Sequence, residues 1–175
     1  SIISENLDWK KLSGKNIQIT GASGMLPAYL IDVICYLVEN KIIENVLLLA
    51  LVRNLDYAQN RFKIYSKIRY LRFVVQDVNK DINIKEDINV IIHSASQASP
   101  KYYINDPVGT LLPNITGTIN LLNLARKKNV ENFIYFSSSE VYGNYLGESI
   151  DETNYGSIDP LEERSCYSES KRMGE

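Results

Sequence analysis

The chain has 175 residues, 45% of them hydrophobic, which is enough to bury a sizeable core and fits one domain. Lys and Arg number 19 against 21 Asp and Glu, and this near balance argues against a nucleic-acid footprint or a polybasic membrane patch. The longest apolar run, 46–52, is too short to span a bilayer, and two cysteines with one histidine suggest no disulfide framework and no metal site. We expect a cytoplasmic protein whose partners are small molecules, with no nucleic acid and no membrane.

The first elements predicted along the chain are a strand, a glycine turn and a helix. Residues 15–20 read as a short strand that runs directly into GASGM. Helical spacing then relates the apolar residues Leu26, Leu30, Val33, Ile34, Leu37 and Val38, and this pattern ends near Asn40. The continuous apolar run 46–52 indicates a parallel strand covered on both faces. The polar stretch 56–67 that follows is predicted to be helical.

Three further strands are predicted at 71–75, 89–94 and 132–137, with a long helix over 106–128. Pro107 is well placed to start that helix, whereas Pro113 either kinks it or marks its true start. The link 76–88 is too polar for a well-packed helix. Alternating strands and helices predict right-handed βαβ units in an α/β, Rossmann-type doubly wound parallel sheet. We assign this dinucleotide-binding domain to residues 14–175, after an N-terminal lead-in, 1–13, anchored by Trp9 and Leu12.

The glycine turn is the first feature that points to chemistry. Gly21 and Gly24 form G-x-x-G between a strand and a helix, where free backbone N–H groups and the helix dipole favour a pyrophosphate. A glycine pair alone also serves turns that bind nothing, so its position carries the prediction. Pro27 occupies the place of the usual third glycine. Where the second strand ends, an acid normally binds the adenosine ribose of NAD, but this chain has Arg53 there. NADP is therefore also a possible cofactor, because a basic residue at this place can bind its 2′-phosphate. The ordinary alternative is that Arg53 merely stacks on the adenine or is solvated.

Several motifs together resemble the extended short-chain dehydrogenase/reductase family of nucleotide-sugar epimerases, dehydratases and decarboxylases. They follow one another in the family's order along nearly the whole chain: TGASGM at 20–25, QDV at 76–78, HSAS at 93–96, PNITGTINLL at 113–122, SSSEVYG at 137–143 and YSESK at 167–171. Within the family, the stretches 98–110, 137–144 and 154–175 are most similar to the UDP-glucuronate decarboxylases. The resemblance implies a nucleotide-sugar substrate, bound NAD and a homodimer in the full-length protein.

The resemblance also implies which residues form the site. The cofactor-binding set, completed by the glycine turn and Arg53, is Gly21, Ser23, Gly24, Met25, Leu26, Arg53, Asp77, Val78, Ser94, Ala95, Ser96, Asn114, Tyr167 and Lys171. The catalytic set is Ser138, Ser139, Glu140, Tyr167 and Lys171. No metal ligand is expected. A smaller C-terminal substrate domain follows the Tyr/Lys helix in the family, so we expect residues 1–175 to be the N-terminal part of a longer protein.

The chemistry of these residue types agrees with that implication. A phenol has a pKa of about 10, and a Lys ammonium one helical turn away favours the phenolate, which can take the proton from a sugar 4-hydroxyl. Oxidation at C4 makes a C6 carboxylate a β-keto acid, which loses CO2 readily. Glu140 and Ser139 would orient the ring near C5. The family's 4,6-dehydratases carry an Asp-Glu pair here, so Ser139 disfavours dehydration and leaves decarboxylation or 4-epimerisation.

Each site residue also has an ordinary structural interpretation. The serines 137–139 could form a strand-end turn, Glu140 a solvated acid, Lys171 a surface charge and Asn114 a helix cap. His93 is expected to be a packed, neutral imidazole at the end of a buried strand. A catalytically silent NAD(P)-binding module remains the alternative from another class, and a purely structural domain is the third. We expect the fragment to bind NAD or NADP but to turn over nucleotide-sugar poorly.

Overall fold

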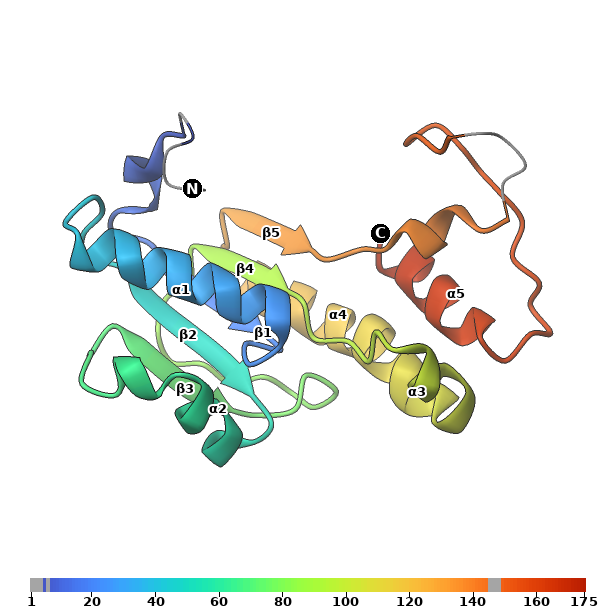
Figure 1. The fold of residues 1–175 in the computed structure, drawn as a ribbon, viewed down its shortest axis with the longest axis horizontal. Coiled ribbons are helices and arrows are strands. Elements are labelled where there is room, and N and C mark those ends of the chain that lie inside the picture. The colour runs from blue at the N-terminus through green and yellow to red at the C-terminus, as the bar shows by residue number, and fades with distance from the viewer. Residues whose placement is uncertain (1–4, 6, 145–148) are drawn as a thin grey trace.

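The computed structural model describes residues 5, 7–144 and 149–175. Its centre is a five-stranded sheet, parallel throughout, in the order β3-β2-β1-β4-β5 (Figure 1). The strands are β1 (Asn16–Thr20), β2 (Leu47–Val52), β3 (Leu71–Val75), β4 (Val90–His93) and β5 (Asn132–Tyr135). This confirms the predicted Rossmann-type sheet, and each strand lies within two residues of its predicted ends.

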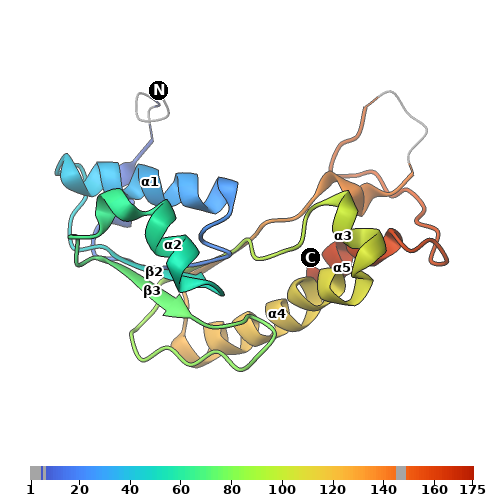
Figure 2. The same ribbon diagram turned by 60° about the horizontal axis from the view of Figure 1, so that its bottom comes forward.

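Helices cover both faces of the sheet (Figure 2). The helices α1 (Met25–Glu39) and α2 (Leu55–Arg61) lie over one face, and α4 (Pro107–Lys128) lies over the other. Side chains alternate between the faces, so Ile19 packs into the core under α1, whereas Ile91 packs with Leu121 of α4. Because β2 is covered on both faces, five of its six residues are buried and it reads as an unbroken apolar run, as predicted.

The helix α4 begins at Pro107, as predicted, and Pro113 lies inside it without ending it. A proline removes the N–H that would bond the carbonyl four residues earlier. Here that carbonyl belongs to Gly109, and the side-chain amide of Gln97 donates to it at 3.1 Å. The replacement donor satisfies the carbonyl that Pro113 leaves unpaired. Pro113 therefore neither starts the helix nor breaks it.

Two segments differ in detail from the predicted elements, and the link after β3 agrees with its prediction. The stretch 56–67 holds two short helices, α2 and a 3-10 turn at Lys63–Tyr65. α2 begins at Leu55, because Asn54 caps it by accepting from the Tyr57 N–H at 2.8 Å. A further helix, α3 (Pro100–Asn105), was not predicted. The link 76–89 forms no helix, as predicted.

Although it has no helix, the link 76–89 still covers the sheet. Val78, Ile84 and Ile88 are buried in the core formed with α4. The loop thus replaces the helix that would normally cover this part of the sheet.

The two ends of the described chain are held differently. Trp9 and Leu12, on a 3-10 turn, pack against the core under α1, as expected of the lead-in. The C-terminal helix α5 (Ser165–Gly174) packs on α4, away from α1 (Figure 1). Both cysteines are free thiols. Within the described ranges, no helix has the length and apolar character needed to cross a membrane.

Candidate active site

The carboxyl ends of the strands bring the predicted cofactor residues to one edge of the sheet. Because the strands are parallel and in register, their ends form a row: Asp77 after β3, Arg53 after β2, Gly21 after β1 and Ser94 after β4. Open α/β sheets bind ligands at this edge. The order of the row follows from the sheet topology, although the residues lie far apart in sequence.

The glycine turn closes tightly against the end of β4. Gly21 has φ +60°, and a Cβ at this position would lie 2.9 Å from the Cα of Ala95, so a larger residue would force the two segments apart. Thr20 ties the same strands together, because its Oγ1 accepts from the Ala95 N–H at 3.1 Å. Gly24 precedes α1, and no side chain caps that helix. The helix N-terminus, with its partial positive charge, therefore stays open toward the turn.

A cavity of about 280 Å³ lies beside this turn, and we call it the glycine cleft. It is lined by Gly21, Ser23, Gly24, Leu51, Val52, Arg53, Asn54, Asp77, Val78, Asn79, Ala95, Ser96, Gln97 and Pro113. Two buried polar atoms of its wall, Ser96 Oγ and Gln97 Oε1, have no hydrogen-bond partner among the described residues. The glycines that permit close approach and the open helix N-terminus, with its free N–H donors, match what a dinucleotide phosphate requires.

Other members of the predicted cofactor set lie outside the glycine cleft. Met25 and Leu26 stand on the first turn of α1 with exposed side chains. Ser94 Oγ donates to the Thr20 carbonyl at 2.5 Å and so joins β4 to β1. Asn114 lies inside α4, where its amide donates to Ser170 Oγ at 3.0 Å and ties α4 to α5. Asn114 is thus no helix cap.

Tyr167 and Lys171 are both buried, on the face of α5 that packs on the protein. The Tyr167 ring stacks on Tyr103 with centroids 4.5 Å apart. Lys171 Nζ donates to the Phe136 carbonyl at 2.6 Å and lies 4.7 Å from the centroid of the Tyr135 ring. Removal from water lowers the pKa of Lys171 to about 8. The interpretation of Lys171 as a surface charge is therefore wrong.

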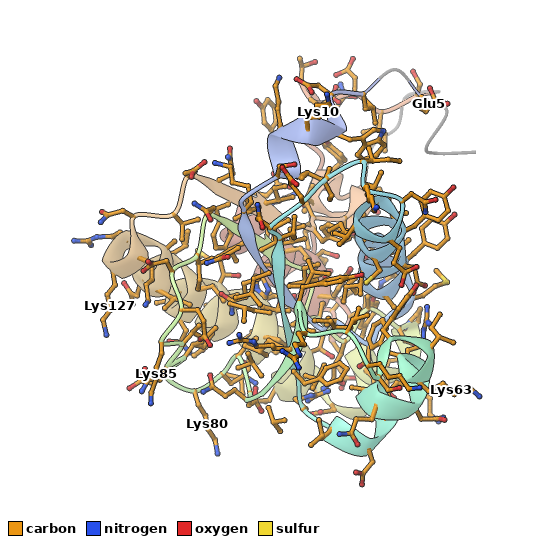
Figure 3. All side chains as sticks on the ribbon, turned by 90° about the vertical axis from the view of Figure 1, so that its left-hand side faces the viewer. Glu5, Lys10, Lys63, Lys80, Lys85 and Lys127 are labelled. Carbon is orange, nitrogen blue, oxygen red and sulfur yellow. The ribbon has the colours of Figure 1, made fainter. Side chains whose placement is uncertain are left out.

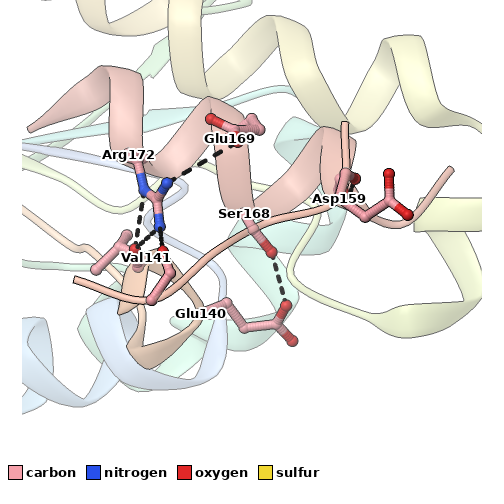
Figure 4. A network of polar contacts seen from close by, with 8 residues as sticks. Glu140, Val141, Asp159, Ser168, Glu169 and Arg172 are labelled. Carbon is pink, nitrogen blue, oxygen red and sulfur yellow. Dashed lines mark hydrogen bonds and ion pairs between the residues drawn. The ribbon is translucent and has the colours of Figure 1, made fainter. Parts of the chain in front are cut away.

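The serine turn after β5 brings Glu140 against α5. Ser138 Oγ accepts from the Glu140 N–H at 3.2 Å, so Ser138 does serve the local backbone, as its ordinary interpretation held. The Glu140 carboxylate accepts from Arg164 at 2.7 Å. It also accepts from Ser168 Oγ at 2.8 Å (Figure 4). Glu140 is a held carboxylate rather than a solvated loop acid. Ser139 is exposed beside it.

A second cavity of about 280 Å³ opens at this turn, and we call it the loop pocket. It is lined by Ser139, Glu140, Gly143, Asn144, Ile150, Ser157, Ile158, Asp159, Glu162, Arg164, Ser165 and Ser168. The loop pocket and the glycine cleft share no residue, and neither Tyr167 nor Lys171 lines either of them. The structure thus brings the predicted residues to one edge of the sheet but not into a single cavity.

Sequence reasoning missed the arginines that fix this region. Arg164 holds Glu140, and Arg172 donates to the Val141 carbonyl through both Nε, at 2.9 Å, and an Nη, at 2.7 Å (Figure 4). The same Nη lies 3.2 Å from the Gly156 carbonyl, so Arg172 joins α5 to two loops. Both arginines flank the YSESK motif, and their proximity to it was the only signal available in the sequence.

His93 is the packed neutral imidazole that was expected. It is buried, with Nδ1 2.9 Å from Thr20 Oγ1 and Nε2 3.2 Å from the Pro113 carbonyl. Burial, together with the charge of Lys171, lowers the pKa of His93 to about 4.

Sequence comparison places this site in a family. The NAD dependent epimerase/dehydratase family matches residues 17–175. The chain belongs to this family. UDP-glucuronic acid decarboxylase 1 of Arabidopsis thaliana is 33% identical over 159 residues, which are 91% of this chain and 34% of that protein. UDP-glucuronic acid decarboxylase 1 of Danio rerio is 29% identical over 92% of this chain and 36% of its own length.

Solved structures of the epimerase/dehydratase type share the fold. The dTDP-glucose 4,6-dehydratase DesIV of Streptomyces venezuelae, solved with NAD bound, has a TM-score of 0.74 and 21% identity, over 91% of this chain and 49% of DesIV. The UDP-glucose 4-epimerase of Thermotoga maritima, solved with UDP-glucose, has a TM-score of 0.68 and 22% identity, over 91% and 48%. This epimerase/dehydratase chain spans from about a third to about half of the length of these proteins.

Proposed function

We propose that this chain is the cofactor-binding part of a nucleotide-sugar enzyme that transiently oxidises the sugar C4 hydroxyl, with decarboxylation of UDP-glucuronate as its reaction. The observation that carries the proposal is the pairing of a buried tyrosine and a buried lysine, Tyr167 and Lys171, on one face of α5. The similarity to UDP-glucuronic acid decarboxylases over 91% of the chain supports the choice of reaction.

The glycine cleft would hold NAD or NADP, with the pyrophosphate at the Gly21–Gly24 turn. The bound dinucleotide supplies the capacity to accept a hydride from C4 and to return it. In the row of strand ends, the adenosine would then extend toward Arg53 and Asp77, and the nicotinamide toward Ser94 and the serine turn. This direction follows from the position of β1 between β2 and β4.

Tyr167 would take the proton of the C4 hydroxyl. The Lys171 ammonium, 5.9 Å from the centroid of the Tyr167 ring, would stabilise negative charge on the phenol oxygen. Ser138 would hydrogen-bond the same sugar oxygen and fix its position. Because Arg164 and Ser168 both hold the Glu140 carboxylate, that group would keep a fixed orientation near C5 and C6, where it would help to relay a proton to C5 after CO2 has left.

Two measurements test the proposal, one on this chain and one on the full-length protein. Titration of this chain with NAD and NADP, followed by the fluorescence of Trp9 and by calorimetry, should show saturable binding. Mass spectrometry after incubation of the full-length protein with the dinucleotide and UDP-glucuronate should show loss of CO2. Loss of water from a dTDP- or CDP-hexose would instead favour a 4,6-dehydratase, and inversion at C4 of a UDP-hexose would favour an epimerase.

A dinucleotide-binding module without turnover is the second candidate. It is favoured by one observation: Tyr167 and Lys171 line neither cavity, and the Tyr167 ring lies against Tyr103. Binding of NAD or NADP by this chain, with no conversion of any of these nucleotide-sugars by the full-length protein, would select this candidate. Failure to bind either NAD or NADP would refute both.

A further inference from the structure

The residue that follows β2 stands where the adenosine ribose would lie. β2 ends at Val52, and Arg53 comes next, between the glycine turn after β1 and Asp77 after β3. A dinucleotide whose pyrophosphate sits at the glycine turn passes this strand end with its adenosine ribose. Arg53 lines the glycine cleft on that side.

No carboxylate occupies the place at which a free ribose would be recognised. An acid after the second strand accepts hydrogen bonds from the 2′- and 3′-hydroxyls, whereas a guanidinium can only donate. Asn54, the next residue, uses its side-chain oxygen to accept from the Tyr57 N–H. The ribose edge of the glycine cleft therefore offers a cation and no free acid from this strand end.

Arg53 is also exposed and keeps its charge available. No ion pair or side-chain hydrogen bond of Arg53 occurs within residues 7–144 and 149–175, although Arg61 and Arg72 of the same region both pair with acids, at 2.9 and 3.0 Å. Arg53 thus differs from its neighbours in having a guanidinium that a ligand could engage without displacing a carboxylate.

A second cation lies on the outer side of Arg53. A more open cavity of about 450 Å³, the outer pocket, is lined by Arg53, Val75, Gln76, Asp77, Lys80 and Asp81. Lys80 extends from the loop after β3 into solvent (Figure 3). Two carboxylates share the outer pocket, and Asp77 Oδ1 already accepts from the Asn79 N–H at 2.9 Å. Arg53 and Asp77 line both the glycine cleft and the outer pocket, and Arg53 is the cation of the two, so a phosphate bound to its guanidinium can reach from one cavity into the other.

We infer that the glycine cleft selects NADP over NAD, with the 2′-phosphate held by Arg53 and supported by Lys80. This inference rests on the proposed dinucleotide binding and adds the choice of cofactor to it. A charge-assisted bond to phosphate strengthens binding by about 10- to 100-fold. We therefore expect the dissociation constant of NADP to be at least about tenfold lower than that of NAD at low salt, with a smaller gap at high salt.

Calorimetric titration with NADP and NAD tests the inference directly. Arg53→Asp should reverse the preference, because it removes the cation and supplies the acceptor that the free ribose needs. Arg53→Gln should lower the ratio of NADP affinity to NAD affinity about tenfold or more, because it removes the cation that the 2′-phosphate engages. Lys80→Ala should weaken NADP binding alone, by a smaller factor. Adenosine 2′,5′-bisphosphate should bind more tightly than adenosine 5′-monophosphate to the unmodified chain, which tests the subsite without the nicotinamide half.

Arg69→Asp is the matched control, because it makes the same change of charge on an exposed arginine that precedes β3, at the amino ends of the strands and so away from the glycine cleft. It should leave the preference for NADP intact. Circular dichroism of every variant checks that it folds. If NAD binds as tightly as NADP, or if Arg53→Gln leaves the ratio unchanged, the inference is overturned and the proposed function stands. If neither dinucleotide binds, the proposed function fails and the inference with it.

Discussion

Replacement of Lys171 by Met should change how the stability of the fold depends on pH. The Lys171 side chain is 3% exposed, and loss of water lowers its pKa from the ordinary 10.5 to about 8. Between these two values the unfolded chain holds a proton that the folded chain has released, so the free energy of unfolding rises with pH. The two pKa values differ by about 2.5, which corresponds to about 3 kcal/mol in total, since one unit is worth about 1.36 kcal/mol.

Urea unfolding of the unmodified chain and of Lys171→Met, at pH 7, 8, 9 and 10, measures this effect. Trp9 fluorescence and far-ultraviolet circular dichroism report the transition. The unfolding free energy of the unmodified chain minus that of Lys171→Met should rise by about 2 to 3 kcal/mol between pH 7 and pH 10. Groups that titrate in both proteins, such as the tyrosines, cancel in the difference.

Lys63→Met is the control, because Lys63 stands on the surface and does not leave water on folding (Figure 3). The unfolding free energy of Lys63→Met should differ from that of the unmodified chain by the same amount at every pH. Parallel curves for Lys171→Met as well would refute the reasoning, since they would mean that the Lys171 ammonium is solvated in the folded state. A lysine Nζ or Cε resonance of Lys171 that titrates near 10.5 would refute it too.

Other residues give predictions of the same kind. His93 is the only histidine, so its ring proton resonances are unique, and they should show no titration above pH 5. As pH falls from about 6.5 to about 4, the unfolded chain binds a proton that the folded chain does not, so the free energy of unfolding should fall. Gln18 is fully buried and both its amide atoms lack a partner among the described residues, so Gln18→Met should raise the unfolding free energy in urea by about 1 kcal/mol or more. Gly21→Ala should lower stability by more than about 1 kcal/mol and weaken dinucleotide binding, measured by calorimetry. Gly14→Ala, with φ +73° and no atom within 4 Å of the added Cβ, separates backbone strain from the clash with Ala95.

The elements could be predicted because their signals are local. A continuous apolar run, such as 46–52, and a glycine turn between strand and helix each lie within a few residues. The role of Pro113 could not be resolved in this way, because it depends on Gln97, which precedes Gly109 by 12 positions and donates to its carbonyl. The short helix α3 was missed because it carries no apolar pattern long enough to show a helical period.

The candidate site divides in the same manner. Gly21, Arg53 and Asp77 could be predicted because each follows directly on a strand, and the sheet topology brings strand ends together. The burial of Lys171 could not be predicted, because it depends on the Phe136 carbonyl, 35 positions earlier in the chain. Nor could the hold of Arg164 on Glu140, which joins residues 24 positions apart across a loop.

The burial of Lys171 lowers the stability of the fold, and this cost indicates a role for α5 beyond structure. Taking an ammonium out of water costs folding free energy, and the Phe136 carbonyl with the Tyr135 ring offsets only part of that cost, because the pKa remains lowered. A surface helix would avoid the cost by turning Lys171 outward, as Lys63 and Lys80 are turned (Figure 3). Groups with strongly lowered pKa values that lie beside other polar side chains concentrate at functional sites. The stability that Lys171 costs is therefore the strongest physical reason to regard α5 as part of a site rather than as a structural helix.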